Sequence, residues 1–183
     1  MAEAGVGWIQ VRAKRLAGGV LHAQVEACCG IVAAAGVELW IDDRADLAAL
    51  LPVRGVHVGQ RDLPAAAVRR VVGGGVWIGL STHGLEQVAA ADADPNVDVI
   101  AVGPLYATTG KERPDPIVGL ELLRRARQIT RKPLVAIGGI DAERLPEVLA
   151  AGADAAAILG AVCRGDVATN CRRLLAAARA AGR

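Results

Sequence analysis

Aromatic residues are almost absent from this 183-residue chain, which has no phenylalanine, one tyrosine and three tryptophans. Proteins bind single-stranded nucleic acids largely by stacking bases on aromatic rings, and they bind duplexes through basic patches. The chain offers neither feature, because 21 basic residues are nearly balanced by 19 acidic ones and no basic run occurs. We therefore expect no nucleic-acid partner.

Long apolar runs and a cysteine framework are also missing. Charged residues interrupt every apolar stretch before it reaches the ~18 residues of a membrane span. The N-terminus lacks the basic and apolar regions of a signal peptide. The four cysteines include no Cys-x-x-Cys pair, so we interpret them as reduced core residues rather than metal ligands. These features predict a cytoplasmic protein with no membrane partner.

The composition, at 53% hydrophobic and 22% charged, suffices for one buried core, and the length predicts a single domain over residues 1–183. Short apolar runs alternate with helical patterns, which is typical of a parallel α/β fold. Seven such units favour a TIM-type (β/α) barrel that is one unit short of the usual eight. The predicted strands are Trp8–Val11, Glu38–Ile41, Gly55–Gly59, Val76–Leu80, Val97–Gly103, Pro133–Gly138 and Ala155–Leu159. Helical spacing spans Leu16–Ala35, Leu85–Ala91, Leu120–Ile129, Leu145–Ala151 and Leu174–Ala180.

Polar residues gather where these runs end. Gln10, Arg12 and Lys14 alternate along the end of the first run, so their side chains leave the same side of the chain. In parallel α/β folds, ligands bind at the carboxyl ends of the strands. Two of only three lysines, Lys14 and Lys111, lie in such positions, and a flexible ammonium suits a phosphate oxygen. The alternative is that both lysines are simply solvated.

Two aspartates end neighbouring runs, Asp43 after the second and Asp62 after the third. Adjacent strands lie ~4.8 Å apart, so the two carboxylates can share one cation. Mg²⁺ usually takes one or two carboxylates and completes its shell with substrate phosphates and water. The pair therefore indicates a Mg²⁺ site, with a helix cap for Asp43 and a loop carboxylate for Asp62 as the alternatives.

Gly138 and Gly139 follow the sixth run and precede a helical segment. Backbone N–H groups at such a place form an anion site, and Gly160 would complete the same cradle after the seventh run. His57 lies within the third run, where we interpret it as an interior residue of the barrel. The sequence thus predicts two anion sites facing one pocket.

These motifs, in this order, resemble the thiamine-phosphate synthase family. The segments that carry the resemblance are Ile9–Lys14, Asp42–Ala48, Gly55–Pro64, Gly79–His83, Val102–Lys111 and Ala136–Ile140. The resemblance implies a transferase on a (β/α)₈ barrel that couples a pyrimidine-methyl diphosphate to a thiazole phosphate and releases pyrophosphate. It also implies Mg²⁺ as the cofactor.

The resemblance assigns roles to individual residues. It places Lys14, Ser81 and Lys111 as catalytic residues at the pyrophosphate, beside Gln10, Arg12 and Asp42. Asp43 and Asp62 match the Mg²⁺ ligands. The residues that match the family's binding site for the thiazole ring and its phosphate are Thr108, Thr109, Gly110, Gly138, Gly139, Leu159 and Gly160.

The chain departs from the family pattern in several places. Met1 falls where the family completes its first helix. We therefore expect an N-terminal truncation relative to the family and a seven-stranded barrel with two unpaired edges. Homo-oligomerisation is one way to cover those edges. Asp42 and Arg144 stand where the family usually has Asn, and Gly160 replaces a serine. These departures leave a non-catalytic ligand-binding paralogue as one alternative. A thiazole tautomerase is another, although Pro104 stands where that family uses a histidine.

Overall fold

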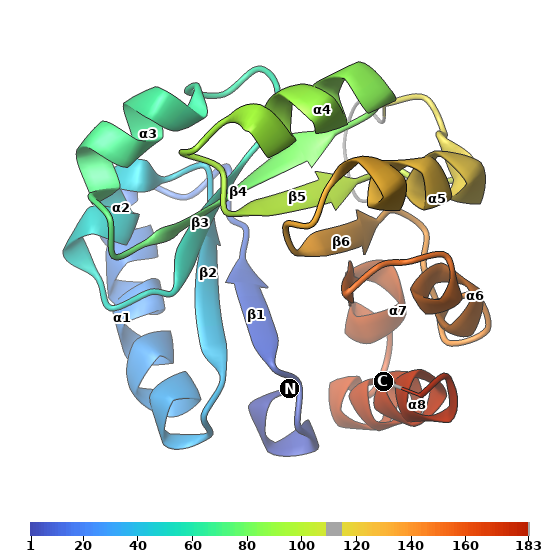
Figure 1. Ribbon diagram of the computed structural model, residues 1–183. Helices are drawn as coiled ribbons and strands as arrows, with labels where there is room; N and C mark the ends of the chain where they lie inside the picture. Colours follow the sequence, from blue (N-terminus) through green and yellow to red (C-terminus); the bar gives the residue numbers. More distant parts are fainter. Residues whose placement is uncertain (109–114, 183) are drawn as a thin grey trace.

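The computed structural model describes residues 1–108 and 115–182, and it shows a parallel sheet with helices along its outer side (Figure 1). The predicted parallel α/β fold is confirmed, with seven strands paired in chain order. They are β1 (Trp8–Val11), β2 (Glu38–Asp42), β3 (Gly55–Val58), β4 (Trp77–Thr82), β5 (Val99–Val102), β6 (Leu134–Ile137) and β7 (Ala155–Ala157).

Helices follow the strands, and a short 3₁₀ helix, η1 (Ala2–Ala4), precedes them. The α-helices are α1 (Gly18–Ala34), α2 (Ala45–Leu50), α3 (Ala65–Val72), α4 (Leu85–Ala93), α5 (Gly119–Ile129), α6 (Leu145–Ala150), α7 (Gly160–Cys163) and α8 (Val167–Ala180). The sheet curls so that β1 and β7 form its two ends, each bonded to a single described strand. η1 contacts α8, which brings the two ends of the chain to the same side of the molecule (Figure 1).

The two faces of the sheet have different cores. Outward-facing residues such as Ile41, Ile78 and Ile100 are completely buried against the helices. On the inner face, the indole of Trp40 packs directly over Gly55. A Cβ atom on Gly55 would lie only 2.6 Å from the indole ring. Trp8 stacks on Trp40 with a centroid separation of 5.0 Å. Any side chain at position 55 would clash with the indole, so the packing of Trp40 requires glycine there.

Several boundaries differ from the sequence-based expectation. Ser81 lies within β4 rather than after it, because β4 extends to Thr82. Helix α8 begins at Val167, seven residues before the predicted start, where Asp166 caps it by accepting a hydrogen bond from the Thr169 N–H at 2.8 Å. Helices α2, α3 and α7 lie outside the helical ranges predicted from the sequence.

Candidate active site

Three side chains from the end of β1 converge on the last residue of β2. Gln10 Nε2 donates a hydrogen bond to Asp42 Oδ1 at 3.1 Å. Arg12 Nε lies 3.3 Å from Asp42 Oδ2, and Lys14 Nζ lies 3.8 Å from the same oxygen. Alternate residues of an extended segment share one face, so all three reach the same carboxylate. The structure therefore brings these four sequence-derived site residues together.

Asp43 completes this cluster at the start of the next loop. Lys14 Nζ lies 2.6 Å from Asp43 Oδ2, the shortest ion pair that Lys14 makes here. Asp43 has a φ of +61°, a left-handed conformation that is uncommon outside glycine but tolerated by aspartate. Its N–H donates to the carbonyl of His57 on β3 at 2.8 Å. That bond holds the Asp43 backbone at the carboxyl end of β3.

Asp62 faces the same group from the β3–α3 loop. Its Oδ2 accepts a hydrogen bond from the Gly59 N–H at 2.8 Å. The negative charge of Asp62 contributes to raising the pKa of both Lys14 and Asp42. Three carboxylates and two cationic side chains therefore act on one another at the ends of β1, β2 and β3. We call Arg12, Lys14, Asp42, Asp43 and Asp62 the charged cluster.

Burial and charge shift the protonation of the cluster. Burial first, and then repulsion from Asp43, raise the pKa of Asp42 to about 6, although Lys14 and Arg12 act in the opposite direction. The hydrogen bond to Asp43 raises the pKa of Lys14, so this ammonium stays charged through the physiological range. The carboxylate of Asp42 therefore changes its charge close to neutral pH.

Ser81 lies deeper, on the inner face of β4. It is 5% exposed, and its Oγ is 2.8 Å from His57 Nε2. Its carbonyl accepts a hydrogen bond from Gln60 Nε2 at 2.7 Å. His57 faces the barrel interior, as its position within a strand predicted, and it orients the Ser81 hydroxyl.

The donor chemistry around Asp43 and Asp62 suits a hard divalent cation. Carboxylate oxygens are the ligands that Mg²⁺ prefers, and one or two of them are enough when phosphate oxygens and water supply the rest. Within residues 1–108 and 115–182, no three His, Cys, Asp or Glu side chains are grouped so that they could hold a metal ion. A cation at this pair would therefore share its shell with a ligand.

The glycines after β5 and β6 allow two loops to touch. A Cβ on Gly103 would lie 2.2 Å from the carbonyl oxygen of Ile137, and one on Gly138 would lie 2.5 Å from Pro104. Gly139 has a φ of +67°, and a Cβ there would lie 2.5 Å from the carbonyl oxygen of Ala107. Side chains at these positions would separate the two loops, so the predicted Gly138–Gly139 pair has a packing role in addition to any role in binding.

The remaining sequence-derived residues lie in the β5–α5 loop, lie at the start of α7, or fall outside the described part. Thr108 ends the described stretch of the β5–α5 loop, and Leu159 is 57% exposed just before α7. Gly160 begins α7 with open space where a side chain would stand. Thr109, Gly110 and Lys111 lie outside the described residues.

Comparison with known proteins decides the family. A model of the thiamine monophosphate synthase family matches residues 1–162. The chain belongs to this family. Family membership makes it a transferase of thiamine biosynthesis, as its motifs predicted.

Relatives and solved structures agree with this assignment. A thiamine-phosphate synthase of Koribacter versatilis is 50% identical over 123 residues, which cover 67% of this chain and 58% of that relative. One from Methanoculleus marisnigri is 40% identical over 186 residues, covering all of this chain and 88% of the relative. The structure of thiamine phosphate pyrophosphorylase from Pyrococcus furiosus has a TM-score of 0.90 at 26% identity, covering 98% of this chain and 86% of that one.

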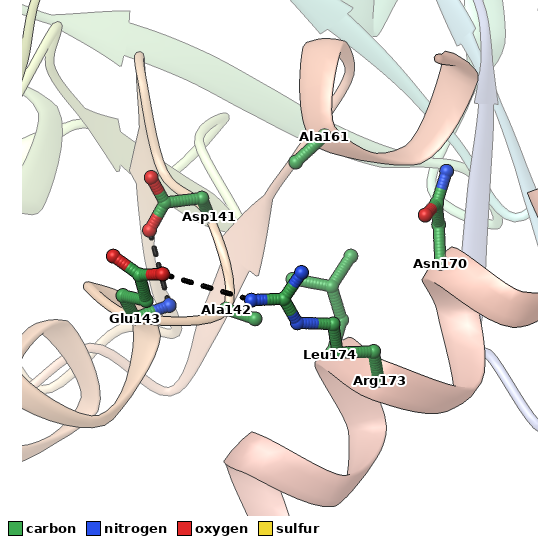
Figure 2. Close-up of a pocket in the computed structure, with 7 residues that line it drawn as sticks. All are labelled: Asp141, Ala142, Glu143, Ala161, Asn170, Arg173 and Leu174. Atoms are coloured by element: carbon green, nitrogen blue, oxygen red, sulfur yellow. Dashed lines mark hydrogen bonds and ion pairs between the residues drawn. The ribbon is translucent and has the colours of Figure 1, made fainter. Parts of the chain in front are cut away.

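A hollow of about 190 Å³ lies beside the synthase-family motifs but contains none of the predicted site residues (Figure 2). Figure 2 shows Arg173 of α8 directed at Glu143, with which it forms an ion pair at 3.7 Å. The residues that line the hollow are Asp141, Ala142, Glu143, Ala161, Asn170, Arg173 and Leu174. The hollow therefore separates the β6–α6 loop from α8, whereas the charged cluster lies at the ends of β1 to β3.

Sequence reasoning missed the contacts of Tyr106. Its hydroxyl donates to Glu147 Oε1 at 2.5 Å, and the Arg144 guanidinium lies 4.6 Å from its ring centroid. Arg144 Nη1 also donates to the Gly139 carbonyl at 2.7 Å. The only available signals were that Tyr106 is the sole tyrosine and that Arg144 departs from the family pattern.

Proposed function

We propose that this chain couples a pyrimidine-methyl diphosphate to a thiazole phosphate, giving thiamine phosphate and pyrophosphate, at the carboxyl-end face of its sheet. The observation that carries this proposal is the charged cluster, because a diphosphate needs cations and metal-binding carboxylates at one place. Lys14 lies within 3.8 Å of both Asp42 and Asp43, and Asp62 acts on the same group.

In this proposal the diphosphate lies against Gln10, Arg12 and Lys14. Arg12 and Lys14 are 39% and 49% exposed, so both can turn from their carboxylate partners to a ligand. Ser81 supports the site from beneath through its hydroxyl. Lys111 is assigned to the same diphosphate by the family motif alone.

Asp43 and Asp62 would hold Mg²⁺. When bound there, the ion would neutralise charge that develops on the departing pyrophosphate. Arg12 and Lys14 stabilise the same developing charge, and donors that are already in place at the transition state are the most effective. The pyrimidine carbon is then captured by the thiazole nitrogen. This chemistry needs no protein nucleophile, so holding the two substrates aligned is the main contribution of the chain.

The thiazole phosphate would lie at the later loops, near Gly138, Gly139, Leu159 and Gly160, with the Thr108–Gly110 segment beside the thiazole ring. The close contact between the β5–α5 and β6–α6 loops supports this location, because both loops would border one substrate. Together the two sites would hold the reacting carbon and nitrogen between the early and the late strands.

Release of pyrophosphate tests the proposal. We expect purified protein with both substrates and Mg²⁺ to release pyrophosphate, and chelation of the metal to abolish the release. Replacement Lys14→Met should lower kcat/KM by about a hundredfold, since it removes a charge-assisted contact to the leaving group. Arg124→Gln, on the exposed face of α5, is the matched control and should leave the rate unchanged. Full activity in the Lys14 variant would contradict the assignment.

We also propose a cytoplasmic location, because all four cysteines are unpaired thiols. Homo-oligomerisation through the exposed sheet ends is part of the same proposal, and sedimentation of the purified chain tests it. No described helix is long and apolar enough to cross a membrane.

A further inference from the structure

Each of the two peptide units after β6 is held by a hydrogen bond to its carbonyl oxygen. Tyr106 N–H donates to the Gly138 carbonyl at 3.1 Å, and Arg144 Nη1 donates to the Gly139 carbonyl at 2.7 Å. Both peptide bonds are trans. A trans peptide is planar, so its N–H points opposite to its carbonyl. Fixing these carbonyls therefore also fixes the directions of the Gly139 and Ile140 N–H groups.

Those two N–H groups have no hydrogen-bond acceptor among the residues that the structure describes. Ile140 is 4% exposed, and Gly139 is partly buried. Buried backbone donors are nearly always paired in folded proteins. An anionic ligand between successive N–H groups satisfies them, and positive φ values such as those of Gly138 and Gly139 produce this arrangement.

Arg144 is itself held in place by two further residues. Its guanidinium lies 4.6 Å from the Tyr106 ring centroid, and the Tyr106 hydroxyl donates to Glu147 Oε1 at 2.5 Å. Arg144 Nη1 lies 3.8 Å from Asp141 Oδ2, which adds a carboxylate to the same side. Glu147 and Arg144 belong to the α6 region, whereas Tyr106 belongs to the β5–α5 loop. The three residues therefore join the two loops.

We propose that Arg144 and Tyr106 are positioning residues that aim the Gly139 and Ile140 N–H groups at the phosphate of the thiazole substrate. This inference rests on the proposed function. Arg144 acts through the Gly139 carbonyl, and Tyr106 acts through its backbone N–H and through the ring that supports the guanidinium. Glu147 holds the Tyr106 ring by its hydroxyl.

Steady-state kinetics with each substrate varied separately tests the inference. We expect Arg144→Ala to raise the KM for thiazole phosphate about tenfold, as for the loss of one charge-assisted hydrogen bond. The kcat and the KM for the pyrimidine diphosphate should stay within about twofold. The lost contact would weaken only the binding of thiazole phosphate, and it would do so equally in the ground state and in the transition state. Arg124→Gln is the control, because Arg124 is a similarly exposed arginine on α5 whose ion pair is with Glu121 of the same helix.

A second variant separates positioning from direct charge. Tyr106→Phe keeps the ring and changes no charge at neutral pH, yet it releases the ring from Glu147. We expect its KM for thiazole phosphate to rise about threefold, and the double variant to bind no worse than Arg144→Ala, since both act on one loop. Additive effects, or a normal KM in Tyr106→Phe, would overturn the proposal in favour of a direct contact between Arg144 and the phosphate.

A structural readout completes the test. In ¹⁵N-labelled protein, the amide signals of Gly139 and Ile140 should move when thiazole phosphate alone is added, and they should already be displaced in unliganded Arg144→Ala. If the wild-type protein binds thiazole phosphate while these two signals stay fixed, the inference fails and the proposed function stands. If thiazole phosphate does not bind and no pyrophosphate is released, the proposed function itself fails.

Discussion

The most informative single change in the charged cluster is Asp42→Asn. The amide retains the oxygen that accepts the Gln10 hydrogen bond and removes the charge that engages Arg12 and Lys14. The side chain of Asp42 is only 10% exposed, so its charge is poorly screened. A diphosphate bound by the same two cations would lie close to that carboxylate. The substitution should therefore strengthen binding of pyrophosphate.

Coulomb's law sets the magnitude. For two unit charges about 5 Å apart, the repulsion is ~1 kcal/mol in a water-like medium and ~3 kcal/mol at an effective dielectric of 20. The site lies between these limits, so we expect pyrophosphate to bind about tenfold more tightly to the variant at pH 8. Isothermal titration calorimetry without added Mg²⁺ measures this ratio directly, because a cation bound at Asp43 and Asp62 would itself change the charge around Asp42.

The pH dependence gives a stricter check. The pKa of Asp42 is about 6, so the wild-type side chain is mostly neutral at pH 5 and the advantage of the variant should largely disappear there. Protonation of pyrophosphate itself cancels in the ratio of the two proteins. A variant that binds more weakly, or a ratio that is equal at both pH values, would show that Asp42 orients Arg12 and Lys14 instead of opposing the ligand.

The same group links pH to stability. Its pKa in the folded protein is above the ordinary value of 3.8, so the native state binds this proton more tightly than the unfolded chain does. Its contribution to stability is thus present below about pH 4 and is lost as the pH rises to about 6. The loss is ~3 kcal/mol from the size of the shift. Urea unfolding should show this decline in the wild type but not in Asp42→Asn.

Two further substitutions test the later loops. Gly160→Ser should fold normally, because nothing lies within 4 Å of the new Cβ, and its hydroxyl should lower the KM for thiazole phosphate about threefold; an unchanged KM would place the phosphate elsewhere. Gly103→Ala should cost more than ~3 kcal/mol in urea unfolding, because its Cβ would lie 2.2 Å from the Ile137 carbonyl, whereas Gly74→Ala, with open space around it, should cost less than ~1 kcal/mol. Equal costs for the two alanines would show that the loops can separate freely.

The sequence predicted the strands well because parallel strands buried on both faces form short apolar runs that end at glycine or polar residues. It predicted that Lys14, Asp43 and Asp62 gather at one edge of the sheet for a related reason. The carboxyl ends of consecutive parallel strands share one edge, so chain order alone brings their following residues together. The family motifs added the roles of these residues, which topology cannot supply.

Contacts that side chains make with glycine residues or with backbone carbonyls were not predictable from the sequence. The indole of Trp40 fills the interior because Gly55 and Gly79 leave room for it, and no periodicity reveals which glycine accommodates which ring. The link from Arg144 to Gly139 depends on a loop conformation with two positive φ values. Such contacts depend on local backbone geometry, which residue spacing does not encode.

The charge balance of the cluster predicts how the ligand enters. Among the described residues, three carboxylates face two cations, so the cluster is net negative whenever Asp42 is ionised. A free diphosphate would be repelled, whereas a diphosphate that arrives with Mg²⁺ brings compensating charge to Asp43 and Asp62. We therefore expect Mg²⁺ to strengthen pyrophosphate binding more at pH 8 than at pH 5, and Asp42→Asn to reduce that difference. Calorimetry with and without Mg²⁺ at both pH values measures it. An enhancement by Mg²⁺ that is equal at the two pH values in the wild type would mean that Asp42 does not share the electrostatic field of the metal pair.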